Sequence, residues 1–284
     1  MTPAGKLLAG RARQEFAAAI QSTETRIDLA RVALLIAAEE EPPTDVAHYL
    51  ALLDELGGAA RVRINQSDDD PVETFNQFMF EELGFNGNQV DYYNARNSFL
   101  NEVLESRTGI PITLSIAYME IGRRAGLAVE GIGLPGHFIV RVSGGQDVLP
   151  QTFVDPFHRR TLTSTDCQDL LDTVYGGHVA LTQAHLRAAT DRQILVRLLT
   201  NLKGVYAAGK LPKRALSVVE RILLLAPDSL NERRDRGALL AQLGRTAEAL
   251  DELKRYLRNV PDAPDEEAVR TQLKELQTQH ATLN

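Results

Sequence analysis

The sequence predicts an α+β fold in which helices dominate, with a small antiparallel sheet in the middle and repeated helical hairpins at the C-terminal end. Three observations lead to this prediction. An apolar segment opened by proline runs from Pro111 to Ala125, short β-branched segments follow between Val129 and Val154, and a 34-residue period occupies the last hundred residues. Proline suits the first helical position, and a helix that is apolar on nearly all sides is a buried one.

Residues 1–83 are predicted to form a helical segment that packs on the core. Residues 11–37 are rich in Ala, Glu, Arg and Leu and predict one helix, which the two prolines at 42–43 end. A second helix is expected over 46–56, where glycines 57–58 stop it.

Residues 84–183 are predicted to form the core. Val129–Ile132 is a short apolar strand between glycines, and His137–Val142 alternates as a second strand. Ser143–Gln146 has the composition of a hairpin turn, and Val148–Val154 returns as the partner strand.

His137 and Asp155 are predicted to meet at one end of this sheet. His137 opens one strand and Asp155 closes its antiparallel partner, so the two residues lie side by side above the start of the Pro111 helix. A Cys-His-Asp site uses this arrangement, because the helix dipole favours a thiolate, the imidazole acts as base and the carboxylate orients it.

Four phrases of this region resemble a known family. They are Asn-Ser-Phe-Leu-Asn-Glu-Val-Leu at 97–104, Arg-Thr-Gly-Ile-Pro-Ile-Thr-Leu-Ser at 107–115, Gly-Leu-Pro-Gly-His-Phe at 133–138 and Asp-Pro-Phe at 155–157. In this order they resemble the transglutaminase-like, or papain-like, core. They are still more similar to the bacterial SirB-type family, which joins such a core to tetratricopeptide repeats. The resemblance covers most of the chain.

The chain departs from this family at the nucleophile. Where the transglutaminase-like pattern has cysteine, this chain has Pro111, which carries no nucleophilic group. The only cysteine, Cys167, lies outside the motif. Thr113 is a weak candidate for a replacement nucleophile. It and Ser115 lie inside the helix rather than at its tip, so neither reaches His137 easily. The resemblance therefore implies a relic pair, His137 and Asp155, without its thiol.

Several neighbours of this pair are candidates for a cleft. Tyr92 and Tyr93, in the polar loop before the motif, either line one side of the cleft or pack against the core. The two asparagines, one helical turn apart, either donate amides as oxyanion donors or anchor the loop. The basic tripeptide 158–160 either neutralises an acidic ligand or is a solvated loop. The candidate cleft residues are Tyr92, Tyr93, Asn97, Asn101, Gly136 and His158.

Residues 184–284 are predicted to be tetratricopeptide-like repeats with a capping helix, because helical hairpins of this type recur every 34 residues. The first helices are expected at Ile194–Ala208 and Asn231–Leu243, and the cap at Asp265–Gln279. Two units and a cap are fewer than the usual minimum, so we expect them to pack on the rest of the protein. The repeat is carried by Ala215, Leu216, Val219, Leu223, Pro227 and Asp228, which recur as Ala249, Leu250, Leu253, Leu257, Pro261 and Asp262.

Composition excludes several classes of function. A net charge of −7 and a pI near 5.5 argue against nucleic-acid binding. One cysteine excludes an internal disulfide, and no nucleotide-binding or His-Glu-x-x-His motif is present. A metal site of His137, Asp155 and His158 lacks a recognised ligand spacing, so neither a metal nor a cofactor is expected. We expect no signal peptide and no membrane span, and therefore a cytoplasmic protein.

Three functional hypotheses follow. The first is a catalytically inactive transglutaminase-like protein that binds or regulates a protein or peptide through the relic cleft or the repeat surface. The second is a hydrolase or acyl transferase in which His137, oriented by Asp155, activates water or a hydroxyl. The third is an assembly scaffold. Pro111 favours the first, with neither nucleic acid nor membrane as partner.

Overall fold

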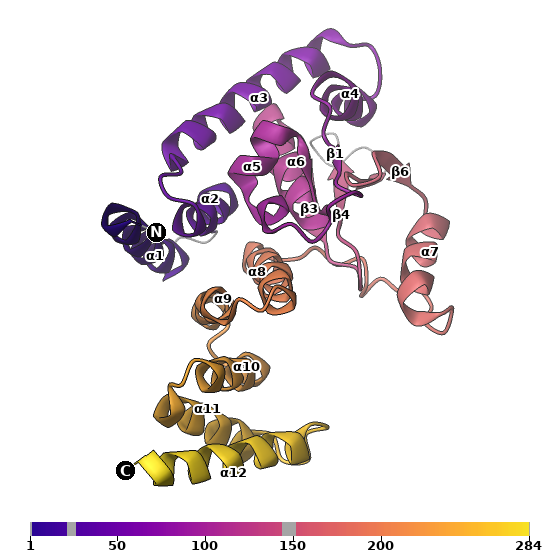
Figure 1. Cartoon of the computed structure of the whole chain (residues 1–284). Coiled ribbons are helices and arrows are strands. Elements are labelled where there is room, and N and C mark those ends of the chain that lie inside the picture. Colours follow the sequence, from indigo (N-terminus) through magenta and orange to yellow (C-terminus); the bar gives the residue numbers. More distant parts are fainter. Residues whose placement is uncertain (1, 22–26, 144–151, 284) are drawn as a thin grey trace. The chain divides into compact units, whose positions relative to one another are not determined.

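The computed structural model describes residues 2–21, 27–143 and 152–283. The chain divides into two compact units, Met1–Leu198 and Leu199–Asn284. Helices dominate both units and the sheets are small, which confirms the predicted α+β fold with a helical majority (Figure 1).

The first unit begins with two helices, α1 (Pro3–Gln21) and α2 (Leu29–Glu40). The prediction of one helix over 11–37 is therefore wrong. The physical reason is the N-cap at Asp28, whose carboxylate accepts a hydrogen bond from the backbone N–H of Arg31 at 3.0 Å. Such a cap satisfies donors that only a helix start leaves open.

Helix α3 (Val46–Gln66) runs through the two glycines that were predicted to end it. It packs on α6 (Pro111–Ala125), and Asp54 binds Arg124 across the contact at 2.7 Å. A Cβ at Gly57 would lie 2.2 Å from the Cβ of Arg124. Gly57 is thus a point of close helix approach, and the packing outweighs the low helix propensity of glycine.

Short elements connect α3 to the central helix. Helix α4 (Pro71–Gln77) starts at the N-cap Asp70 and continues as a π-helix, η1 (Phe78–Glu82). A 3-10 turn, η2 (Ala95–Ser98), precedes α5 (Leu100–Ser106). The two-residue strands β1 (Asn86–Gly87) and β2 (Thr108–Gly109) pair in parallel, which the sequence did not predict.

Helix α6 is the central helix of the first unit, as predicted. Pro111 is its first residue, and Gly126 ends it with a left-handed φ of 101°. The helix contacts α3, α5 and the strand β3, and its side chains are buried except near its C-terminal end. Its N-terminus is therefore a fixed reference point for the site.

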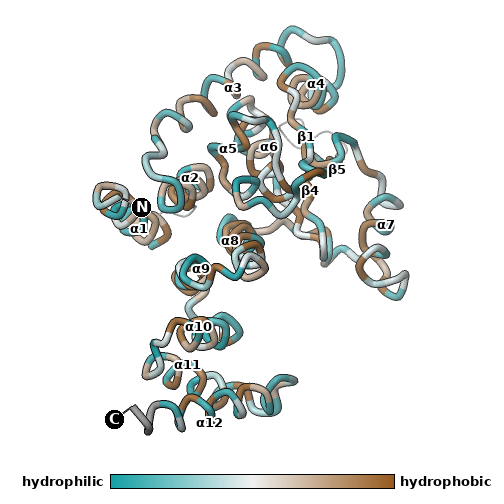
Figure 2. Tube along the Cα trace, in the orientation of Figure 1, coloured by the Kyte–Doolittle hydropathy of each residue, from teal (hydrophilic) through white to brown (hydrophobic). Residues whose placement is uncertain are grey.

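A four-stranded antiparallel sheet with the order β3-β4-β5-β6 lies beside α6. Residues 144–146 of the predicted turn and 148–151 of the predicted strand lie outside the described residues. Val140 pairs with Val154, and hydrophobic residues occur along the traces of β4 and β5 (Figure 2). Strand β4 starts two residues after His137, and β6 was not predicted. The strands are β3 (Ala128–Ile132), β4 (Ile139–Ser143), β5 (Thr152–Asp155) and β6 (Arg160–Leu162).

Helix α7 (Ser164–Tyr175) follows the sheet and starts at a capping box formed by Thr163 and Asp166. Helix α8 (Asp191–Ala208) then leads into the second unit. No helix in the described part of the chain is both long enough and apolar enough to cross a membrane.

The second unit is a stack of helical hairpins. Helices α9 (Pro212–Leu225) and α11 (Thr246–Asn259) are displaced by 34 residues at both ends, since 246 − 212 and 259 − 225 are each 34. Helices α10 (Leu230–Gln242) and α12 (Glu266–Leu283) complete it. The core of the stack includes Leu216, Leu240, Ala249, Leu250, Leu253, Tyr256, Ala263, Val269 and Leu276.

The neighbouring glycines of α3 give a matched test of this packing. Gly57→Ala should lower the free energy of unfolding by about 1–3 kcal/mol, because its methyl group would overlap Arg124. Gly58→Ala should raise it by about 0.5–1 kcal/mol, since no atom lies within 4 Å of a Cβ there and alanine is the better helix former. Urea unfolding followed by circular dichroism measures both, and equal effects would contradict the close approach.

Candidate functional site

The site is built around the carboxylate of Asp155, the last residue of β5, which is fully buried. Its Oδ1 accepts hydrogen bonds from the backbone N–H groups of Phe157 at 3.0 Å and His158 at 3.2 Å. Its Oδ2 lies 2.9 Å from Nε2 of His137 and 2.6 Å from Nδ1 of His158. Both carboxylate oxygens are thus satisfied by groups that the local chain supplies.

A turn places His137 beside this carboxylate. Pro135 and Gly136 are its central residues, and the backbone N–H of His137 donates to the carbonyl of Leu134 at 3.2 Å. Gly136 has a φ of +72°, which suits the third position of a type II turn. A Cβ at this glycine would lie 2.5 Å from Cγ2 of Val174 in α7. The predicted cleft residue Gly136 therefore shapes the turn that presents His137.

The register of the sheet completes the arrangement. Because Val140 pairs with Val154, the same register carried outward places His137 opposite Phe157. The two rings lie 6.3 Å apart, and the imidazole reaches back along the strand to Asp155. The structure thus brings together the predicted pair.

The carboxylate of Asp155 is ionised in this environment. Burial alone would raise its pKa, but the hydrogen bonds and charges of His137 and His158 outweigh burial and lower the pKa to about 2. An ionised carboxylate only accepts hydrogen bonds. The neutral ring of His137 therefore carries its proton on Nε2, and that of His158 carries it on Nδ1.

His158, a predicted cleft residue, is the second histidine of the site. Its side chain is 41% exposed, against 11% for His137, and the two rings stack at 5.5 Å with an angle of 27°. The rest of the basic tripeptide is engaged elsewhere, since Arg159 binds Glu81 and Arg160 lies 3.4 Å from Asp166.

A local signal for His158 was present in the sequence. In Asp-Pro-Phe-His, an aspartate that accepts from the following backbone N–H groups turns the chain back, and this brings the third residue after it alongside.

The hydroxyl groups near the start of α6 have structural partners. Pro111 is buried at the first helical position. The fully buried Oγ1 of Thr113 donates to the carbonyl of Asn97 at 2.6 Å and accepts from the backbone N–H of Ile110 at 3.2 Å. The fully buried Oγ of Ser115 lies 3.4 Å from the carbonyl of Phe138. Thr113 is thus part of the helix cap.

Asn97 anchors the loop of residues 88–94, hereafter the aromatic loop. Its Nδ2 donates to the carbonyls of Asp91 at 2.7 Å and Tyr92 at 3.1 Å, and its Oδ1 accepts from Asn88 at 2.9 Å. These bonds correspond to the anchoring alternative rather than to an oxyanion donor. Asn101 is buried in α5, and its amide lies 3.4 Å from Glu102.

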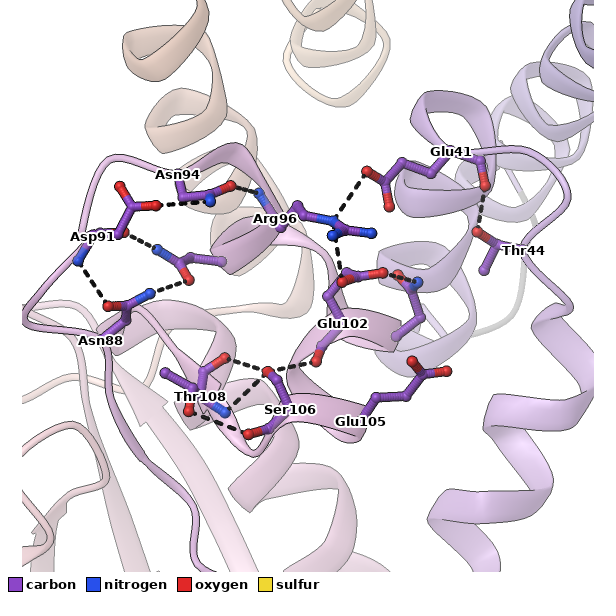
Figure 3. A network of polar contacts seen from close by, with 12 residues as sticks. Glu41, Thr44, Asn88, Asp91, Asn94, Arg96, Glu102, Glu105, Ser106 and Thr108 are labelled. Atoms are coloured by element: carbon purple, nitrogen blue, oxygen red, sulfur yellow. Dashed lines mark hydrogen bonds and ion pairs between the residues drawn. The ribbon is translucent and has the colours of Figure 1, made fainter.

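The aromatic loop lies beside the Asp155 site. The ring of Tyr92 meets Phe157 edge to face at 6.0 Å, and Tyr93 meets Tyr92 at 5.2 Å. Tyr93 is 76% exposed. Figure 3 shows Asn88, Asp91 and Asn94 linked within the loop, and Arg96 extending the polar network to Glu102 and Glu41.

Comparison with known proteins assigns the family. The profile of the transglutaminase-like superfamily matches residues 47–200. A UPF0162 protein of Xylella fastidiosa (strain Temecula1) is 37% identical over 257 residues, which cover 88% of this chain and 90% of that protein. This chain belongs to the UPF0162 family. A UPF0162 protein of Pseudomonas aeruginosa is 33% identical over 221 residues, 76% of this chain and 78% of that protein.

Two further matches each cover only a part of this UPF0162 protein. The tetratricopeptide repeat profile matches residues 202–274, which confirms the predicted repeats behind a transglutaminase-like core. Human F-box only protein 21 is 34% identical over 162 residues, which are 55% of this chain and 25% of that protein. That similarity therefore concerns a limited part of the human protein.

The only cysteine is predicted to be unreactive in the folded protein. Cys167 is fully buried beneath the sheet, and burial, with the charge of Asp166, raises the pKa of its thiol to about 11. Since the thiolate is the nucleophile, labelling at pH 8 by a thiol-specific disulfide reagent should be at least about 100-fold slower in native protein than in urea. The rate should rise with pH toward 11. Complete labelling of native protein within seconds at pH 8 would contradict this assignment.

Proposed function

We propose that this UPF0162 protein is a binding module for other proteins, built on a transglutaminase-like core that performs no cysteine chemistry. The match to tetratricopeptide repeats, which are protein-interaction elements, supports a binding function. We also propose a cytoplasmic location and the SirB-type affiliation. The free buried thiol of Cys167 and the motifs around Pro111 and His137 support them.

The absence of cysteine chemistry rests on three positions. Pro111 stands where the family pattern has cysteine, and proline offers no nucleophile. Thr113 is bonded within the helix cap and has no exposed surface. Cys167 is buried with a raised pKa. None of these three positions offers the imidazole and the carboxylate a side chain to activate.

The observation that carries the binding proposal is the aromatic loop. Val90 is 100% exposed, Tyr93 76% and Tyr92 38%. The loop is ordered before any partner arrives, because Asn88 accepts from the backbone N–H of Asp91 at 2.9 Å and Asp91 accepts from Asn94 at 2.8 Å. An ordered loop loses little conformational entropy on binding, and tyrosines are frequent at the energetic centre of protein interfaces.

The chemistry of the loop defines the partner. Its apolar and aromatic side chains point outward, and the carboxylate of Asp91 is engaged with Asn94. The partner is therefore a segment of another protein that contributes apolar side chains against Tyr93 and Val90. The tetratricopeptide unit would provide a further contact of the same protein–protein type.

One observation keeps a hydrolase as the second candidate. Within the described residues no hydrogen bond occupies Nδ1 of His137, so this nitrogen could take a proton from a water molecule. His137→Ala separates the candidates, since it abolishes hydrolysis by such a base and leaves a contact through Tyr93 in place. Unchanged binding with no activity to lose is the result that the binding proposal expects, whereas a chain that binds no partner and in which His137→Ala lowers only the stability would leave the scaffold hypothesis.

The binding proposal predicts a specific loss on substitution of Tyr93. Partners enriched on the immobilised wild-type chain from a cell extract are identified, purified and titrated by calorimetry against three forms of the protein. Tyr93→Ala should raise the dissociation constant about 5- to 30-fold, because an exposed interface aromatic contributes of the order of 1–2 kcal/mol. Val62→Ala, an exposed apolar position on α3, should leave it unchanged.

The result that would overturn the proposal is equally direct. A purified partner that binds wild type and Tyr93→Ala with the same affinity excludes the aromatic loop as its site. Both variants remove exposed side chains, so their folding is expected to match the wild type, and thermal unfolding verifies this.

A further inference from the structure

His137, Asp155 and His158 present three metal-ligand atoms to one point. Each residue offers one ligand atom, and these three atoms all lie within 4.8 Å of one another. Two of the three separations are 2.9 Å and 2.6 Å, both to the carboxylate oxygen. The residues come from the turn before β4, the end of β5 and the turn after β5, so their backbones are fixed by the same sheet.

We propose that these three residues form a binding site for a single divalent first-row transition metal ion. Two imidazole nitrogens and one carboxylate oxygen are ligands that suit Zn²⁺ and its neighbours, and they leave positions open for water or a ligand. The only thiol, Cys167, is not part of the cluster, so soft, thiolate-dependent ions are disfavoured. The proposal goes beyond the protein-binding function and does not depend on it.

The spacing needs only a small adjustment. Metal–nitrogen and metal–oxygen bonds of about 2.0–2.1 Å put neighbouring ligand atoms about 2.9–3.4 Å apart. The two separations to Oδ2 are already close to that range, at 2.9 Å and 2.6 Å. The side chain of His158 is 41% exposed and has room to rotate, whereas Asp155 and His137 are held in place.

Backbone hydrogen bonds hold the carboxylate of Asp155 in the orientation that a metal ligand needs. Its Oδ1 is held by the backbone N–H groups of Phe157 and His158, so Oδ2 is left as the oxygen that faces the two rings. Hydrogen bonds of this kind fix the direction of a ligating carboxylate and raise metal affinity. The negative charge of the carboxylate offsets part of the charge of the ion.

Metal binding would change the tautomer of both histidine rings. In the metal-free site, Nε2 of His137 and Nδ1 of His158 face the carboxylate as donors. A metal takes the lone pairs of these nitrogens, so each neutral ring carries its proton on the opposite nitrogen instead. The histidine with the more exposed ring, His158, lies on the side from which an ion can enter.

The experiment is a titration of the full chain with Zn²⁺ after removal of adventitious metal with a chelator and desalting. Calorimetry should give one equivalent of bound Zn²⁺. The dissociation constant should rise at least tenfold in His158→Ala and in His158→Gln. It should be unchanged in His178→Ala, an exposed histidine after α7 that lies outside the cluster. Circular dichroism establishes that each variant is folded.

A second measurement tests the ligands without any variant. Co²⁺ added to the metal-free wild-type protein should produce ligand-field absorption bands that one equivalent of Zn²⁺ removes. Absence of stoichiometric binding would overturn the proposal. Binding with the same affinity in His158→Ala would do so too, because the ion would then occupy another part of the surface.

Discussion

The carboxylate of Asp155 is the group on which the arrangement of the site depends. It is fully buried and accepts from two backbone N–H groups and two imidazoles. An ionised group removed from water costs several kcal/mol unless partners replace its hydration. The turn after β5, the ring of His137 and the ring of His158 supply those partners. The position of one oxygen thus determines the direction in which both histidines point.

The transglutaminase-like core holds His137 beside Asp155 and has Pro111 as the first residue of its central helix. Pro111 starts α6 well, because its missing N–H has no partner at a helix start. The hydroxyl of Thr113 caps the same turn. The residues at the tip of α6 therefore stabilise the helix, and under the proposed function His137 and Asp155 serve a role that needs no thiol. The metal site and the binding surface proposed above are two such uses, and they share the Phe157–Tyr92 contact region.

Strong local patterns made part of this structure predictable. Helix α6 has proline at one end and glycine at the other, and the 34-residue period of α9 and α11 is repeated without a shift. The proximity of His137 and Asp155 followed from antiparallel pairing alone. These features rest on contacts that are close in sequence or repeated along it.

The failures involve contacts that local patterns do not encode. The helix predicted over 11–37 divides because Asp28 caps a new helix. Helix α3 passes Gly57 because Arg124, which is distant in the chain, packs against it and leaves no room for a Cβ. Strands β1, β2 and β6 are too short to show a period. His158 approaches Asp155 through a turn around Pro156. This approach matches no recognised ligand spacing, so the sequence pattern predicted no metal site there.

The most direct test of the account is the tautomer of each histidine in the metal-free protein. A long-range ¹⁵N–¹H correlation spectrum of protein labelled at its histidines, recorded at alkaline pH, reports which ring nitrogen carries the proton. The account predicts the Nε2–H form for His137 and the Nδ1–H form for His158, because both must donate to an ionised Asp155. The opposite form in either ring would show that the carboxylate does not organise the site.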